Sequence, residues 1–142
     1  MRTSAIWGSP PGKANFATFV VDRLRTGGTI KALIDQYVSP TNNRLLAKAV
    51  AEIVELKPLG ILHVAGERMS RYEFAVRVAE ALSFDKSLIH EARMEEFKWL
   101  ARRPKDSSLS VEETKERVRT DFHSTKLAME VLREEYERGL PA

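Results

Sequence analysis

Two arginines and a lysine surround a proline in "ARRPKDSSLS", residues 101–110, and these residues have the clearest capacity for binding chemistry in the chain. A guanidinium group binds phosphate or carboxylate through two parallel hydrogen bonds, so Arg102 and Arg103 could together hold an anion. A solvated basic loop that happens to contain a proline explains the same residues equally well. Both interpretations of this segment stay open on sequence grounds.

A second segment, "GSPPGK" at residues 8–13, has the composition of a phosphate-binding loop but not its pattern. Its glycines are one residue too close together, and Ala14 stands where a magnesium-binding Ser or Thr is needed. Pro10 and Pro11 also remove backbone N–H groups that would donate to phosphate. The segment is therefore interpreted as a flexible loop near a ligand.

Other catalytic signatures are missing from the sequence. The histidines His63, His90 and His123 have no i, i+4 pairing, so no metal site is predicted, and the absence of Cys excludes thiolate nucleophiles. There is no G-x-S-x-G elbow, no G-x-G-x-x-G fingerprint and no Tyr-x-x-x-Lys pair. We therefore expect no catalytic residue within these 142 residues.

Composition limits the class of protein. With 142 residues and 43% hydrophobic content, the chain is predicted to form a single unit, residues 1–142, with a real core. Its 23 Lys and Arg are interleaved with 20 Asp and Glu, which argues against nucleic acid as a partner. No apolar run or signal peptide indicates a membrane partner, and the lack of Cys suits the cytoplasm.

Hydrophobic periodicity predicts alternating strands and helices. Strands are expected at 2–7, 29–34, 61–66 and 87–92, and helices at 14–28, 42–56, 71–82, 111–118 and 124–138, with a helical turn near 94–101. Ser70 and Glu73 have the spacing of a capping box. This order predicts an α/β fold with parallel strands. Because a strand at residue 2 has no lead-in, we expect the chain to be the back half of a larger fold.

Five phrases in a fixed order resemble one known family. They are "RTSAIWG", "GKANFA", "LIDQYVSPTNNRLLAKAV", "GILHVAGERMSRYEFAVRVAEAL" and "RRPKDSSLS". Together they resemble the C-terminal half of the dTDP-4-dehydrorhamnose reductases, which are extended short-chain dehydrogenase/reductases. The resemblance implies the C-terminal portion of an NAD(P)-binding Rossmann-like fold: late parallel strands plus a helical substrate-binding lobe. It also implies NAD(P)H as cofactor and a nucleotide-sugar substrate in dTDP-rhamnose biosynthesis.

The resemblance also assigns site residues. Thr3 and Ser4 match positions beside the cofactor, and the substrate-binding set is Trp7, Asn15, Phe16, Gln36, Pro40, Thr41 and Arg103. The family often has Trp where this chain has Ala5, and Trp7 is expected to compensate in part. Asp106 replaces a family Asn, and its charge is expected to oppose a diphosphate unless Arg103 or Lys105 offsets it.

Several functions remain compatible with these residues. The leading hypothesis is the substrate-binding half of a nucleotide-sugar reductase, inactive without a Rossmann half, as a gene fragment, a shortened gene model or part of a split enzyme. The partner is then a separate Rossmann chain or a second copy, paired along an apolar edge exposed at "TSAIW", "IKALI" and "ILHVA". The alternative is a non-catalytic regulatory protein resembling the regulatory subunit of methionine adenosyltransferase. A third reading is a fragment without function.

Overall fold

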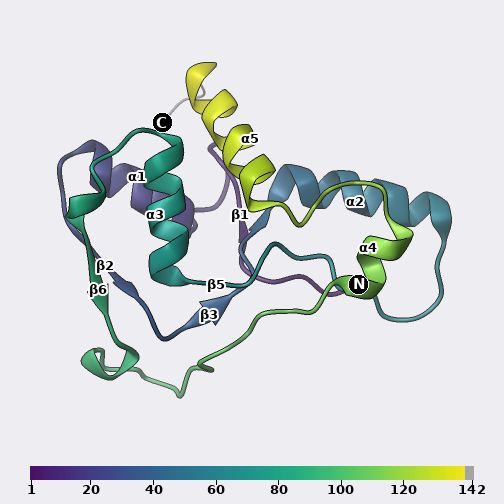
Figure 1. The fold of residues 1–142 in the computed structure, drawn as a ribbon, viewed down its shortest axis with the longest axis horizontal. Helices are drawn as coiled ribbons and strands as arrows, with labels where there is room; N and C mark the ends of the chain where they lie inside the picture. The colour runs from purple at the N-terminus through teal and green to yellow at the C-terminus, as the bar shows by residue number, and fades with distance from the viewer. Residues whose placement is uncertain (140–142) are drawn as a thin grey trace.

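The computed structural model describes residues 1–139, so the predicted unit of residues 1–142 extends three residues beyond the described part. The helices are α1 (Phe16–Arg25), α2 (Asn43–Leu56), α3 (Arg71–Ala81), α4 (Glu112–Arg117) and α5 (Thr125–Glu137). Two short 3-10 turns cover Lys86–Leu88 and Met94–Glu96. The predicted helices are confirmed, with ends that differ by up to a few residues. Figure 1 shows α1 and α3 at one side of the molecule and α2 extending to the other.

The strands form three pairs. β1 (Ile6–Trp7) is parallel to β4 (Thr41–Asn42), and β2 (Ile30–Leu33) is parallel to β6 (Ile89–Ala92). β3 (Tyr37–Val38) runs antiparallel to β5 (Met69–Ser70). The predicted α/β fold with parallel strands is confirmed by the first two pairs. The short strands β3, β4 and β5 were not predicted, because two residues are too few to show a periodic pattern.

Two predicted strands are largely absent from the described residues. The strand expected at 2–7 is interrupted at Ala5, whose φ of +41° lies in the left-handed region. The strand expected at 61–66 is reduced to a single parallel bridge between Arg2 and His63. Arg2 donates its N–H to the Leu62 carbonyl (2.8 Å) and accepts from the Val64 N–H (2.9 Å). The two segments therefore lie side by side without forming a continuous ladder.

Local sequence explains where the helices begin and end. Asn15 caps α1 and exchanges hydrogen bonds with Thr18, and the predicted capping box of Ser70 and Glu73 opens α3. α2 ends at Leu56, as predicted, and Lys57, directly before Pro58, adopts the left-handed conformation (φ +46°) at its C-cap. These caps fix the start of α1 and α3, which carry residues of the site described below.

α3 is the centre of the core. It packs against α1, α5, β2 and β6, and its Phe74 and Val78 are buried. The predicted exposed apolar edge is present at Ile6 and Ile61, which are 51% and 59% exposed. It is wrong for β2, because that strand pairs with β6 and is mostly buried. Within residues 1–139, no helix has the length and apolar character needed to cross a membrane.

Candidate functional site

A cavity of about 470 Å³ opens where β2, the first turns of α1 and α3 and the segment 97–103 meet. Its lining residues are Phe16, Lys31, Ala32, Leu33, Gln36, Arg71, Phe97, Trp99 and Arg103. This volume is in the range of sites for small-molecule ligands. Three of the predicted substrate residues, Phe16, Gln36 and Arg103, are brought together here from distant parts of the sequence. Their roles in binding stay predictions.

Positive charge dominates the cavity. Lys31, Arg71 and Arg103 line it, and the lining contains no Asp or Glu. None of these three cations forms an ion pair with a carboxylate within residues 1–139. Burial lowers the pKa of Arg71 from its ordinary value, but an arginine remains charged at neutral pH. An anion is the ligand that such an unpaired group of cations can best stabilise.

Gln36, which follows β2, connects the start of α3 with the end of the segment that carries Arg103. Its side-chain oxygen accepts from Arg71 Nε (3.3 Å), and its side-chain nitrogen donates to the Pro104 carbonyl (3.4 Å). The backbone N–H of Arg71 also donates to the Gln36 carbonyl (3.2 Å). Because both polar ends of the Gln36 amide are bonded to protein, the geometry gives this residue the task of orienting Arg71.

Phe16 forms the apolar floor beside Arg71. The Arg71 guanidinium carbon lies 5.3 Å from the centre of the Phe16 ring. The same ring is packed against Phe19 and Phe74, each with ring centres 6.1 Å away. The Phe16 ring is thus packed on several sides, so the apolar floor of the cavity is rigid.

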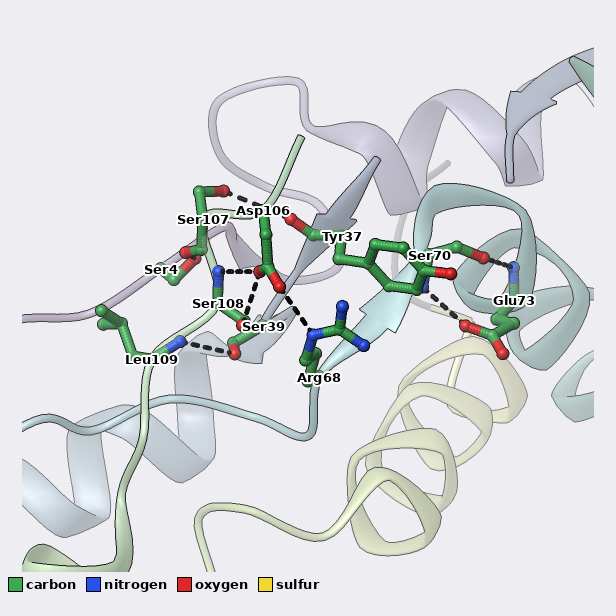
Figure 2. Close-up of polar contacts among 10 residues, drawn as sticks. All are labelled: Ser4, Tyr37, Ser39, Arg68, Ser70, Glu73, Asp106, Ser107, Ser108 and Leu109. Carbon is green, nitrogen blue, oxygen red and sulfur yellow. Dashed lines mark hydrogen bonds and ion pairs between the residues drawn. The ribbon is translucent and has the colours of Figure 1, made fainter. Parts of the chain in front are cut away.

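The segment 104–109 is fastened along β3, as Figure 2 shows. Tyr37 donates its N–H to the Lys105 carbonyl (2.8 Å) and accepts from the Ser107 N–H (3.0 Å). Asp106 accepts from Arg68 Nε at 2.8 Å. Arg68, rather than Arg103 or Lys105, therefore offsets the charge of Asp106, and Asp106 is not among the residues that line the cavity. The effect of Asp106 on a bound diphosphate stays a prediction.

Pro40 and Thr41 lie in the interior. Both are buried, and Thr41 is fully so. The Thr41 hydroxyl lies within donating distance of the Ser4 and Ser39 carbonyls (2.6 and 2.9 Å) and accepts from the Gly66 N–H (3.2 Å). The structure therefore shows Thr41 holding three chain segments together. A direct contact of these two residues with substrate stays a prediction. The cavity beside Pro40 is too small for a sugar.

Trp7 and Asn15 also have structural contacts away from the cavity. Trp7 is 3% exposed and packs on Phe74 with ring centres 5.3 Å apart. Asn15 uses its side chain to cap α1 and to donate to the Gly8 carbonyl (2.9 Å). Trp7 is buried, and the polar atoms of the half-buried Asn15 side chain are bonded to backbone groups, so a substrate contact at either residue stays a prediction.

Thr3 and Ser4, the predicted cofactor contacts, precede β1. The Ser4 hydroxyl donates to the Ser107 carbonyl (3.2 Å), and the buried Thr3 hydroxyl has no hydrogen-bond partner within the described residues. One free hydroxyl without a glycine-rich phosphate loop does not form a dinucleotide site. The residues present therefore do not fit NAD(P)H by themselves, and a contact of Thr3 or Ser4 with that cofactor stays a prediction.

Lys31, Arg71, Phe97 and Trp99 line the cavity but were not predicted from the sequence. A signal for Arg71 existed: it occupies the first turn of α3, where the helix dipole disfavours a cation. Lys31 is the single charged residue in the otherwise apolar β2. The two aromatics are separated by one residue in a polar, exposed segment, which is an unusual place for large apolar side chains.

The cavity lining combines cations with apolar side chains. It has no carboxylate, histidine or hydroxyl side chain that can act as a general acid or base. In the part of the chain that the structure describes, no cluster of His, Asp or Glu has the arrangement of a metal site. The arrangement can hold an anionic ligand with an apolar portion.

The structure has the fold of the C-terminal half of the Rossmann-like extended short-chain dehydrogenase/reductases. A family model described as the RmlD substrate binding domain matches residues 1–137. The chain belongs to that family. A comparison with curated protein sequences gives no match.

Solved structures agree with this assignment. A hypothetical dTDP-4-dehydrorhamnose reductase from Sulfolobus tokodaii is 36% identical over 90% of this chain and 44% of its own, with a TM-score of 0.77. The reductase from Clostridium acetobutylicum is 26% identical over 96% of this chain and 47% of its own, with a TM-score of 0.77. The Bacillus anthracis reductase, solved with NADP, shares the fold at 23% identity and a TM-score of 0.82, over 94% of this chain and 47% of its own. The chain thus spans slightly under half the length of these structures.

Proposed function

We propose that this chain is the substrate-binding part of an NAD(P)H-dependent nucleotide-sugar reductase, and that the cavity binds the nucleotide diphosphate of a dTDP-4-dehydrorhamnose-like substrate. The observation that supports this most is the convergence of Lys31, Arg71 and Arg103 on one cavity without a carboxylate in its lining. Membership of the family provides the substrate class. Catalysis then depends on a Rossmann domain with its own Tyr-x-x-x-Lys pair, in a separate chain or in a longer form of this protein, and the chain alone binds without reducing.

The diphosphate suits the cations on chemical grounds. Arginine forks bind phosphate oxygens in pairs, and lysine adds a third positive charge. Arg71 is already oriented by Gln36 before a ligand arrives, so less conformational entropy is lost on binding. Arg103 directly precedes Pro104, and the Pro104 carbonyl is bonded to Gln36, so the position of Arg103 is also restrained.

Calorimetric titration with dTDP tests this proposal. We expect the wild-type chain to bind dTDP, and Arg103→Gln to weaken binding about tenfold, since hydrogen bonds to charged groups contribute roughly 1.5–3 kcal/mol. Arg102→Gln is the matched control, because Arg102 is the adjacent arginine but does not line the cavity. No dTDP binding by the wild type, or an equal loss in both variants, would contradict the proposal. The catalytic part is tested by measuring NADPH oxidation. We expect none from the chain alone, and activity when a Rossmann domain of this family is added.

A further inference from the structure

Trp99 is an exposed aromatic at the edge of the cavity. It is 42% exposed, and its indole Nε1 donates to the Met94 carbonyl at 2.8 Å, which fixes one edge of the ring. Phe97 supports it from one side, with ring centres 6.0 Å apart and planes inclined by 46°. A large apolar ring in this position is unusual for a surface residue and leaves indole surface free to contact a ligand in the cavity.

Phe16, another aromatic of the cavity, is not available in the same way. The Phe16 ring already contacts Phe19, Phe74 and the Arg71 guanidinium. Trp7, which the sequence suggested as an aromatic contact, is 3% exposed in the core. Phe97 and Trp99 both line the cavity and are 39% and 42% exposed. Trp99 has the larger ring of the two, and its Nε1 bond to the Met94 carbonyl fixes the position of that ring.

Trp99 and Arg103 come from the same segment. This segment is anchored before Trp99 by the Met94 N–H, which donates to Asp35 Oδ1 (2.9 Å), and after Arg103 by the Pro104 carbonyl, which accepts from Gln36. Between these anchors, one short stretch supplies both a cation and an indole ring to the cavity. A ligand with a phosphate and a planar ring can use both groups together.

We propose that Trp99, supported by Phe97, is a stacking platform for the nucleobase and determines that the site selects a nucleoside diphosphate over a bare diphosphate. This inference rests on the proposed function, because the cations are taken to hold the diphosphate. The base stacks on the indole face, and the Nε1 bond to Met94 keeps the indole in place. Trp99 thus replaces, from a different segment, the aromatic contact that was expected of Trp7.

The test compares two probes, dTDP and inorganic pyrophosphate, by calorimetric titration. We expect Trp99→Ala to weaken dTDP binding about tenfold, in line with the loss of one base–aromatic stack, and to leave pyrophosphate binding unchanged. Trp99→Phe should restore most of the dTDP affinity because it keeps an aromatic face. Leu100→Ala is the matched control, since Leu100 is the fully exposed neighbour and does not line the cavity.

Fluorescence gives a second readout. The wild-type spectrum minus the Trp99→Phe spectrum isolates the emission of Trp99 from that of the buried Trp7. We expect dTDP, and not pyrophosphate, to change this difference and to protect it from acrylamide quenching. Equal dTDP affinity in wild type and Trp99→Ala would overturn the inference, and so would an equal loss of affinity for dTDP and pyrophosphate. The proposed function would still stand in either case if Arg103→Gln weakens dTDP binding. If neither probe binds the wild type, both are overturned.

Discussion

The side chain of Asp106 accepts a 2.8 Å hydrogen bond from Arg68, and the same guanidinium lies 3.8 Å from the centre of the Tyr37 ring. Figure 2 shows Arg68 between the carboxylate and the tyrosine. Asp106 also accepts from the hydroxyl and the N–H of Ser108 (2.6 and 2.9 Å). Because these contacts join segment 104–109 to β3 and to the turn before β5, they fix the far end of the segment that carries Arg103.

The Asp106 contacts predict a pH-dependent stability. The Ser108 hydroxyl and N–H, and then Arg68, lower the pKa of Asp106 from 3.8 to about 2. Since the folded pKa is the lower one, the stabilisation is complete above pH 3.8 and is lost as the pH falls towards 2. We expect Asp106→Asn to melt at a lower temperature than wild type at neutral pH, and the two melting temperatures to converge near pH 2.

Thermal unfolding followed by circular dichroism from pH 7 to 2 measures this difference. Arg68→Gln removes the same ion pair from the other side and should shrink the effect of Asp106→Asn, as in a double-mutant cycle. A melting-temperature difference between wild type and Asp106→Asn that does not change with pH would show that the charge of Asp106 is not involved.

Thr41→Val should destabilise the fold. The substitution keeps the shape of the side chain but leaves the Ser4 carbonyl, the Ser39 carbonyl and the Gly66 N–H without their buried partner. We expect a loss of about 1–3 kcal/mol in the free energy of unfolding, measured by urea denaturation. Thr29→Val, at an exposed position, is the control. A loss of dTDP affinity without a loss of stability would instead support the substrate contact that the sequence suggested.

Gly66→Ala should be more damaging than Gly8→Ala. A methyl group at Gly66 would overlap the carbonyl oxygen of Pro40, which is backbone and cannot rotate away. At Gly8 it would meet only the exposed side chain of Asn43. We expect about 1–3 kcal/mol lost at Gly66 and a smaller loss at Gly8, by the same denaturation assay. Equal stability of the two variants would mean that Gly66 is not packed as described.

Asn15→Ala separates capping from binding. Asn15 accepts from the N–H groups of Ala17 and Thr18 at 3.0 and 3.2 Å, so its loss should cost about 1 kcal/mol of stability. We expect the dTDP affinity of the folded variant to remain close to wild type. Asn43→Ala, which removes an exposed asparagine, is the control. A large fall in affinity at unchanged stability would return Asn15 to the substrate-binding set.

The sequence predicted the helices well because their signals are local. The capping box of Ser70 and Glu73 and the apolar period of α2 need no information from the rest of the chain. The alternation of strands and helices also predicted that strands would be parallel, as β2 and β6 are, although it did not indicate which strands pair. By contrast, β3 and β5 are defined by hydrogen bonds between distant segments. Each has only two residues, which is too few to show a periodic pattern in the sequence.

The site was predictable only in part for the same reason. Arg103 and Phe16 stand in recognisable phrases, whereas Lys31 and Trp99 acquire their place through the pairing of β2 with β6 and the path of segment 93–104. Thr41 illustrates a different limit: its predicted contact with substrate stays a prediction, and its structural role could not be read from the sequence. In the structure its hydroxyl is hydrogen-bonded to backbone groups in the interior, and the sequence alone does not reveal these contacts.

The central position of α3 bears on how the chain is made. α1 and β2 are synthesised before it and α5 after it, and all of them pack on its faces. Until α3 has been synthesised, the sides of α1 and β2 that pack on it in the folded structure are not covered by it. We expect this part of the chain to become compact only after α3 and β6 have emerged from the ribosome, so the stretch before α3 is the part that most needs a chaperone during synthesis.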